Sequence, residues 1–225
     1  MKLRPLRALK AFYSLARLVH DPDRLDEVFE MSDALATPEA MRPMVDELAK
    51  DPVVARSLEE RHRIRIDLAE LRRLPEGTLG RTFAEHMIAA KLDPAALPTL
   101  PSDDATQFFR AHLYETHDVW HVATGFGTDL VGELGLQAFY LAQIPGPLPS
   151  LLVAVGFLRS ALFDRELTGP FMEALVRGWR MGKTARPLFG VRWDEHWGQP
   201  LAEVRRRLGL DPEDVAAGGV SALAA

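Results

Sequence analysis

Two histidines, an aspartate beside the first of them and a glutamate lie in one short stretch of the chain, "HDVWHVATGFGTDLVGE" at residues 117–133. If a helix covers the first five of these residues, His117 and His121 share one face, because residues four apart are neighbours on a helix. Asp118 then lies about 100° around the helix from His117 and about 60° from His121, at 3.6 residues per turn. Paired imidazoles are common metal ligands, so this spacing predicts a metal site.

Glu133 follows the segment "TGFG" at residues 124–127, whose glycines predict that the first helix ends there. A second helix that folds back can carry the Glu133 carboxylate to the histidine pair. Its neighbours Gly132 and Gly135 allow a close approach to another helix or a ligand, and its face also carries Tyr140. Burying a carboxylate there without a partner would be very costly, which favours a ligand role for Glu133.

A mixed set of nitrogen and oxygen donors suits Zn, Fe(II), Mn or Co and does not choose among them. The chain has no cysteine, which excludes disulfides, thiolate metal sites and cysteine nucleophiles. The alternative is a helical core in which the histidines are hydrogen-bonded and Glu133 pairs with an arginine. Peptidase chemistry of the His-Glu-x-x-His type is disfavoured, because Asp118 is one methylene shorter than the glutamate of that motif and no sheet is predicted upstream.

Helical spacing of apolar residues along nearly the whole chain predicts an all-α fold that presents these residues. Helices are expected near the N-terminus, after residue 127, and within residues 24–35, 37–52, 53–74, 75–94, 103–121, 150–164, 169–188 and 199–210. Thr37 and either Ser102 or Asp103 are the expected N-caps of two of these helices, and Asp129 is expected in the first turn of the helix after residue 127.

Short connections containing proline or glycine predict one helical, bundle-like domain over residues 1–225. Its core is expected at about residues 8–210, with a frayed tail at 211–225, a metal site between two adjacent helices and an apolar groove. Residues 1–20 contain five lysines or arginines and no acid, as a transit peptide does, but their apolar residues favour a first helix of the fold. No charge-free run of 18 residues predicts a membrane span, and the net charge of −5 argues against nucleic-acid binding.

Three ordered blocks resemble one known family. The pattern "HDVWH", eleven residues and then Glu133 resembles the HDxxHx11E signature of a coenzyme Q (ubiquinone) biosynthesis family, the protein numbered fourth in that pathway. The segment "PEGTLGRTFAEHM" at 75–87 is similar to the family's PxTLGxxYAxFM block, with Phe83 for tyrosine and Glu85-His86 for a less polar pair. The segments from Arg177 to Trp197 and from Pro200 to Leu210 resemble its C-terminal block.

The resemblance, which covers about residues 8–210, implies an all-helical protein that works at a membrane face. It implies that a divalent metal, zinc first, is held by His117, Asp118, His121 and Glu133, which would also be the catalytic residues. The implied reaction is the oxidative removal of the C1 carboxylate of a polyprenylated hydroxybenzoate ring, with a hydroxyl in its place. The implied partners are a prenylated aromatic compound or isoprenoid lipid, other ubiquinone biosynthesis proteins, the membrane surface and a second copy of the chain.

The residues suggest how such a substrate could be held. A long apolar tail needs a groove, which the segment "LPSLLVAVGFLRSALF" at 148–163 can line, although it also fits a plain core helix. Trp120 and Tyr140 are candidate contacts for the ring, with core packing as the alternative for Trp120. Cations that can bind a carboxylate or anionic lipid are Arg177, Arg180, Lys183, Arg186 and Arg192. Further candidates for proton transfer are Glu85, His86, Asp194, Glu195 and His196.

A second function remains open: a non-catalytic scaffold that binds polyprenyl lipid and organises the other enzymes. If all four side chains bind a tetrahedral ion, no position is left for a substrate, and the metal is structural. With two histidines and one carboxylate as ligands, positions stay open and the site suits catalysis. The chain is expected in the bacterial cytoplasm, peripheral to the inner membrane.

Overall fold

The computed structural model describes residues 5–94, 99–144 and 146–210. The all-α prediction is confirmed, because the regular elements of these residues are helices. The β-bridge between Thr78 and Pro200 is isolated and belongs to no strand of the described residues. The α-helices are α1 (Pro5–His20), α2 (Leu25–Leu35), α3 (Pro38–Leu48), α4 (Pro52–Glu60), α5 (Leu68–Leu71), α6 (Leu79–Ala89), α7 (Ala105–Thr124), α8 (Leu130–Gln143), α9 (Pro147–Leu162), α10 (Thr168–Thr184) and α11 (Leu201–Leu208). Two 3₁₀ turns are η2 (Arg165–Leu167) and η3 (Trp193–His196). No helix within the described residues has the length and hydropathy needed to cross a bilayer.

The chain forms two compact units, each built from two separate stretches of sequence. The first comprises Met1–Glu47 and Thr128–Lys183, and therefore α1, α2, α8, α9 and nearly all of α3 and α10. The second comprises Leu48–Gly127 and Thr184–Ala225, and therefore α4 to α7 and α11. The single domain expected over residues 1–225 stays a prediction, and the expected tail at 211–225 lies outside the described residues.

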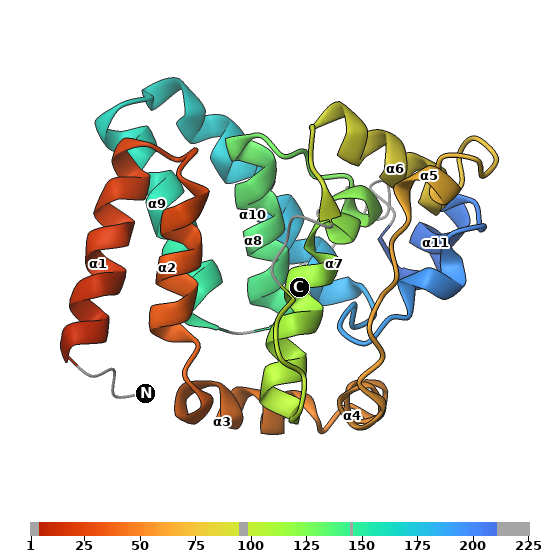
Figure 1. The fold of residues 1–225 in the computed structure, drawn as a ribbon. Coiled ribbons are helices and arrows are strands. Elements are labelled where there is room, and N and C mark those ends of the chain that lie inside the picture. The colour runs from red at the N-terminus through yellow and green to blue at the C-terminus, as the bar shows by residue number, and fades with distance from the viewer. Residues whose placement is uncertain (1–4, 95–98, 145, 211–225) are drawn as a thin grey trace, which may run out of the picture. The chain divides into compact units, whose positions relative to one another are not determined.

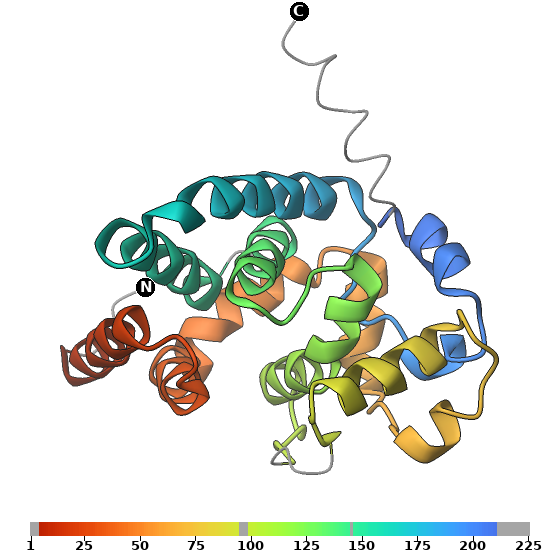
Figure 2. The same ribbon diagram turned by 90° about the horizontal axis from the view of Figure 1, so that it is seen from above.

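The core of the first unit is an apolar cluster between α1, α2 and α9. These three helices lie side by side (Figures 1 and 2). Their buried members are Ala11, Leu18, Val19, Met31, Ala34, Leu35 and Val155. Leu151 and Leu152 of the expected groove segment pack against this cluster, so that part of the segment fills the core. The apolar groove itself stays a prediction.

Helix α10 approaches α8 through glycines. A Cβ built on Gly178 would lie 2.0 Å from the carbonyl oxygen of Gly135, and one on Gly182 would lie 2.8 Å from the carbonyl oxygen of Phe139. Neither contact is possible for a real side chain, so the two backbones can pack this closely only because both positions lack one. The close approach that the sequence predicts at Gly135 is therefore present.

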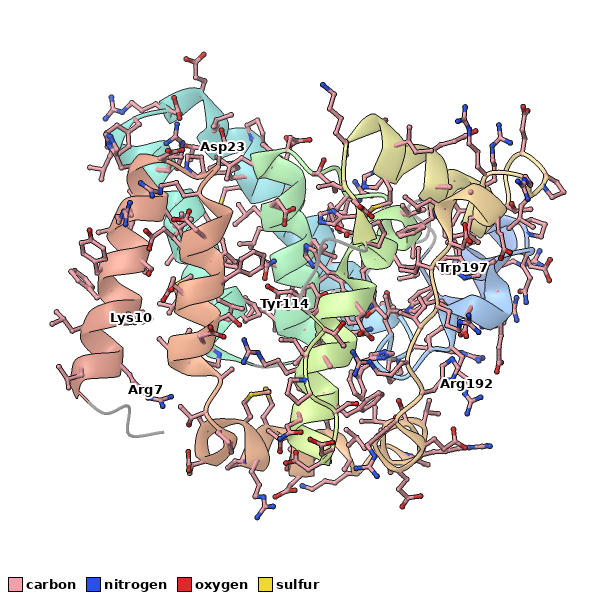
Figure 3. The ribbon with its side chains drawn as sticks, in the orientation of Figure 1. Arg7, Lys10, Asp23, Tyr114, Arg192 and Trp197 are labelled. Atoms are coloured by element: carbon pink, nitrogen blue, oxygen red, sulfur yellow. The ribbon has the colours of Figure 1, made fainter. Side chains whose placement is uncertain are left out.

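In the second unit, α7 packs against α4, α6 and α11. The ring of Trp197, labelled in Figure 3, stacks on the ring of Phe83 of α6 with centroids 5.3 Å apart. The backbone carbonyl of Trp197 accepts the N–H of Gly80 at 2.9 Å. Trp193 and Trp197 are both buried, so the segment around η3 ties the C-terminal residues to α6. This contact holds the face of α6 that packs on α7.

The expected helix over residues 53–74 is interrupted, and this prediction is wrong between α4 and α5. Arg61 ends α4 in the left-handed region, with φ 48°, and residues 61–67 are not helical. The half-buried Arg63 uses this non-helical segment to reach Glu115 of α7, with Nε 2.8 Å from Oε2, and His62 Nε2 lies 2.7 Å from Asp194 Oδ2. Long-range ion pairing overrides the helical propensity of this charged segment.

Side-chain caps begin α3 at the expected residue, and α7 and α8 one or two residues from the expected positions. The hydroxyl of Thr37 accepts the N–H of Ala40 at 3.2 Å, as predicted. Asp104, and not Ser102 or Asp103, caps α7 by accepting the N–H groups of its second and third residues at 2.8 and 2.9 Å. Asp129 does not lie in the first turn of α8 but is its cap.

His112 of α7 is buried in the core of the second unit. Its ring lies 4.9 Å from that of Phe189 and 5.4 Å from that of Phe108, and its Nε2 accepts the N–H of Gly190 at 3.3 Å. Burial lowers the pKa of His112 to about 4, and the charges of His62 and Arg63 act in the same direction. Protonation would also remove the lone pair that accepts from Gly190.

We expect His112 to make the fold acid-sensitive. The unfolded chain takes up this proton near pH 6.5 and the folded chain near pH 4, so the unfolded state binds more protons between these values. The contribution of His112 to the free energy of unfolding therefore falls by roughly 3 kcal/mol as the pH drops through this window. Above the window His112 adds no pH dependence. Urea denaturation of the wild type and His112→Gln at pH 7 and pH 4 should show a smaller pH effect in the variant. Equal pH effects in the two proteins would contradict this assignment, and the exposed His20→Gln serves as the control.

Candidate metal centre

Helix α7 carries two of the predicted ligands on adjacent turns. The Nε2 atoms of His117 and His121 lie 3.2 Å apart, with ring planes at 88°. Two nitrogens bound to one zinc at its usual bond length and tetrahedral angle lie about 3.3 Å apart. His121 is buried and His117 half-buried, so both rings are held by packing. The pair therefore has the spacing that a shared ion requires.

The end of α7 sets the tautomer of His121. Gly125 ends the helix with φ 74° and donates its N–H to the His121 carbonyl, and the chain then turns so that the Phe126 carbonyl lies 3.1 Å from His121 Nδ1. A carbonyl can only accept, so Nδ1 carries the hydrogen and the neutral ring presents the lone pair of Nε2. Such a hydrogen bond on the far nitrogen is the usual way in which proteins orient a metal-binding histidine.

Glu133 completes a set of three. It lies in the first turn of α8 and its N–H donates to the Asp129 carbonyl at 2.8 Å, while the Asp129 carboxylate accepts the N–H groups of Val131 and Gly132 at 3.0 Å. His117, His121 and Glu133 form a group of side chains that could hold a metal ion. Two imidazole nitrogens and one carboxylate oxygen form a donor set that fits a divalent ion. This part of the sequence prediction is confirmed as a group that can bind a metal, whose identity stays open.

Asp118 is not part of this set of three. It is half-buried on α7, and its negative charge acts on His86 of α6. Its predicted roles as a fourth ligand or as an orienting group stay predictions.

His86 lies beside the site on the neighbouring helix. Its ring is nearly parallel to that of His121, with centroids 6.4 Å apart and planes at 21°. Burial lowers the pKa of His86, the charge of His121 lowers it further, and that of Asp118 opposes them. A third imidazole therefore stands next to the ligand pair.

Arg205 of α11 holds the end of α7 and was not singled out from the sequence. Its Nε donates to the Ala123 carbonyl and its Nη2 to the Val122 carbonyl, both at 2.9 Å. These carbonyls belong to the last turn of α7, where a helix has acceptors without partners and favours a positive charge. The basic run at 205–207 was the available signal, but it does not indicate which arginine makes this contact.

The predicted substrate-binding residues occupy different environments. Trp120 of α7 and Tyr140 of α8 are buried, which fits core packing as well as ring contact. Arg177 of α10 is half-buried, and burial lowers its pKa. Arg180 and Lys183 are exposed, and the Lys183 ammonium lies 5.8 Å from the centre of the Trp179 ring. The roles of all five in substrate binding stay predictions.

Relatives of known assignment cover most of the chain. A protein from Xenopus tropicalis named ubiquinone biosynthesis protein COQ4 homolog, mitochondrial, is 29% identical over 204 residues, which are 88% of this chain and 71% of that protein. The Rattus norvegicus protein of the same name is 30% identical over 199 residues, or 86% of this chain and 74% of the relative. An Aspergillus fumigatus protein named ubiquinone biosynthesis protein coq4, mitochondrial, is 30% identical over 201 residues, or 87% and 70%.

A solved structure has the same fold. A crystal structure of a candidate ubiquinone biosynthesis protein from Nostoc punctiforme PCC 73102 superposes with a TM-score of 0.78 at 32% identity. The match covers 90% of this chain and 97% of that one. Residues 3–214 also match the family described as coenzyme Q (ubiquinone) biosynthesis protein Coq4, as the HDxxHx11E pattern indicates. This chain belongs to the Coq4 family of coenzyme Q biosynthesis proteins.

Proposed function

We propose that this protein is a metal-dependent enzyme of ubiquinone biosynthesis that replaces the C1 carboxylate of a polyprenylated hydroxybenzoate with a hydroxyl group. Family membership supports the pathway. The observation that carries the chemistry is the pair of His117 and His121, whose Nε2 atoms lie 3.2 Å apart, with Glu133 as the third member of the group that could hold an ion. Two histidines and one carboxylate leave coordination positions open for a substrate, unlike a site with four protein ligands.

The net reaction breaks the bond between C1 and the carboxylate, releases CO₂ and forms a C1–O bond, which oxidises the substrate by two electrons. With dioxygen as the oxidant, one oxygen atom enters the ring, and the other leaves as water with two further electrons and two protons from a reductant. A divalent ion held by His117, His121 and Glu133 would supply a Lewis acid for oxygen-bearing groups. The hydrogen bond from His121 Nδ1 to the Phe126 carbonyl would orient the imidazole that holds this ion.

The tail of the substrate implies work at a membrane surface. On α10, Met172, Val176 and Trp179 recur at helical spacing and are 46, 39 and 47% exposed, although they are large and apolar. The exposed cations Arg180 and Lys183 accompany them. Apolar and basic residues on one exposed helix suit contact with anionic lipid, and we propose that prenylated substrate enters from such a surface.

Turnover by the purified protein tests the proposed function. The protein is loaded separately with Zn²⁺, Mn²⁺, Fe²⁺ or Co²⁺ and given a short-chain prenylated hydroxybenzoate labelled with ¹³C at the carboxylate, dioxygen and a chemical reductant. We expect labelled CO₂ and the C1-hydroxylated ring with at least one ion, and mass spectrometry should find one atom of ¹⁸O in the product formed under ¹⁸O₂. Tight prenyl binding without product for any bound ion would instead favour the scaffold function.

A further inference from the structure

The side chain of His86 contains a buried polar atom that the described protein does not satisfy. Its Nε2 is inaccessible to solvent and has no hydrogen-bond partner among the described residues. An imidazole nitrogen left this way costs free energy comparable to a lost hydrogen bond. Buried polar groups nearly always have a partner, and an unsatisfied one calls for a water or ligand atom at that place.

The surroundings of His86 indicate where the missing partner belongs. Its ring lies parallel to that of His121, 6.4 Å away between centroids, and the Asp118 charge also acts on it. His86 does not belong to the group of His117, His121 and Glu133 that could hold a metal ion, which argues against direct metal binding. His86 therefore lies beside His121 without belonging to the group of possible metal ligands.

Glu85 and His86 are adjacent polar residues of α6. Glu85 is exposed and pairs with Arg81 of the same helix, so its charge is accounted for at the surface. A phenyl ring in place of His86 would fill similar space beside His121 and leave no polar atom unsatisfied. The imidazole adds a hydrogen-bonding group to the site.

We infer that His86 is a binding residue of this metal centre, which hydrogen-bonds through Nε2 to an oxygen atom of the aromatic carboxylate or phenolate bound at the ion. This inference rests on the ion and the substrate class of the proposed function. The imidazole holds the oxygen-bearing head of the substrate on the α6 side, while His117 and His121 hold the ion from α7. The ring of His86 therefore orients the substrate and does not bind metal.

The test uses the full-length protein loaded with Co²⁺ and 4-hydroxybenzoate as a tail-free probe, and follows the visible absorption of the cobalt ion. We expect His86→Phe to bind Co²⁺ within about twofold of the wild type but to weaken 4-hydroxybenzoate about tenfold, the value of one hydrogen bond. His86→Gln, whose amide can replace Nε2, should restore most of the probe affinity. The control is His20→Phe, which makes the same change at an exposed histidine of α1.

Each result separates the alternatives. Unchanged probe affinity in His86→Phe, or no cobalt spectral response to the probe in the wild type, overturns the inference. A loss of Co²⁺ itself in His86→Phe with normal circular dichroism also overturns it, because His86 would then act on the ion or on His121. Binding of the probe that depends on His86, without decarboxylation of any prenylated compound, upholds the inference and refutes the proposed reaction.

Discussion

Replacing His121 with asparagine should reduce metal affinity by more than 100-fold while the helical fold is kept. Structural zinc sites bind with roughly 10–16 kcal/mol shared among four donors, so one donor contributes about 3 kcal/mol. In the His121→Asn variant the side-chain amide can still donate to the Phe126 carbonyl in place of Nδ1, but it has no nitrogen at the position of Nε2. The change therefore removes the ligand and spares the hydrogen bond that closes the turn after α7.

Metal content measured by mass spectrometry after dialysis, with circular dichroism of the same samples, checks this expectation. Glu133→Gln should give a similar loss, and Glu173→Gln on the exposed surface of α10 should give none. Full occupancy in His121→Asn would refute the assignment of His121 as a ligand. Asp118→Asn in the same assay decides the open question about the fourth ligand, because a loss as large as that of Glu133→Gln would make Asp118 a ligand and favour a structural ion.

Gly178→Ala should destabilise the first unit by about 3 kcal/mol or more, although alanine is the better helix former. The added Cβ would lie 2.0 Å from the Gly135 carbonyl oxygen and 3.1 Å from the Ala138 Cβ. The obstacle at Gly135 is backbone, which cannot rotate away as a side chain can, so α10 and α8 must separate and lose packing along their contact. Because α8 also carries Glu133, we expect weaker metal binding in the same variant.

Urea denaturation of the wild type and two alanine variants checks this prediction. Gly169 lies in the same helix and has no atom within 4 Å of a built Cβ, so Gly169→Ala should stabilise the protein by about 0.5–1 kcal/mol through helix propensity and reduced freedom of the unfolded chain. Opposite signs for the two variants are the expected result. A neutral Gly178→Ala would mean that α8 and α10 do not pack as closely as described.

The sequence alone was sufficient for the features that depend on neighbours along the chain. Helical periodicity predicted the all-α fold, and the glycines of "TGFG" predicted the end of α7, which Gly125 provides with its left-handed conformation. The four-residue spacing of His117 and His121 put both imidazoles on one face before any tertiary contact was known. These predictions succeed because helix geometry and the conformational freedom of glycine are local properties.

Tertiary structure decided the features in which distant segments compete with local preference. Residues 61–67 leave the helical conformation because Arg63 and His62 reach Glu115 and Asp194, partners that a sequence pattern does not reveal. The contact of Arg205 with the end of α7 likewise depends on backbone carbonyls that lie 82 and 83 residues away along the chain. Spacing along a helix can thus nominate two ligands, but only the fold places the imidazole of His86 beside His121, because that contact depends on the distance between separate helices.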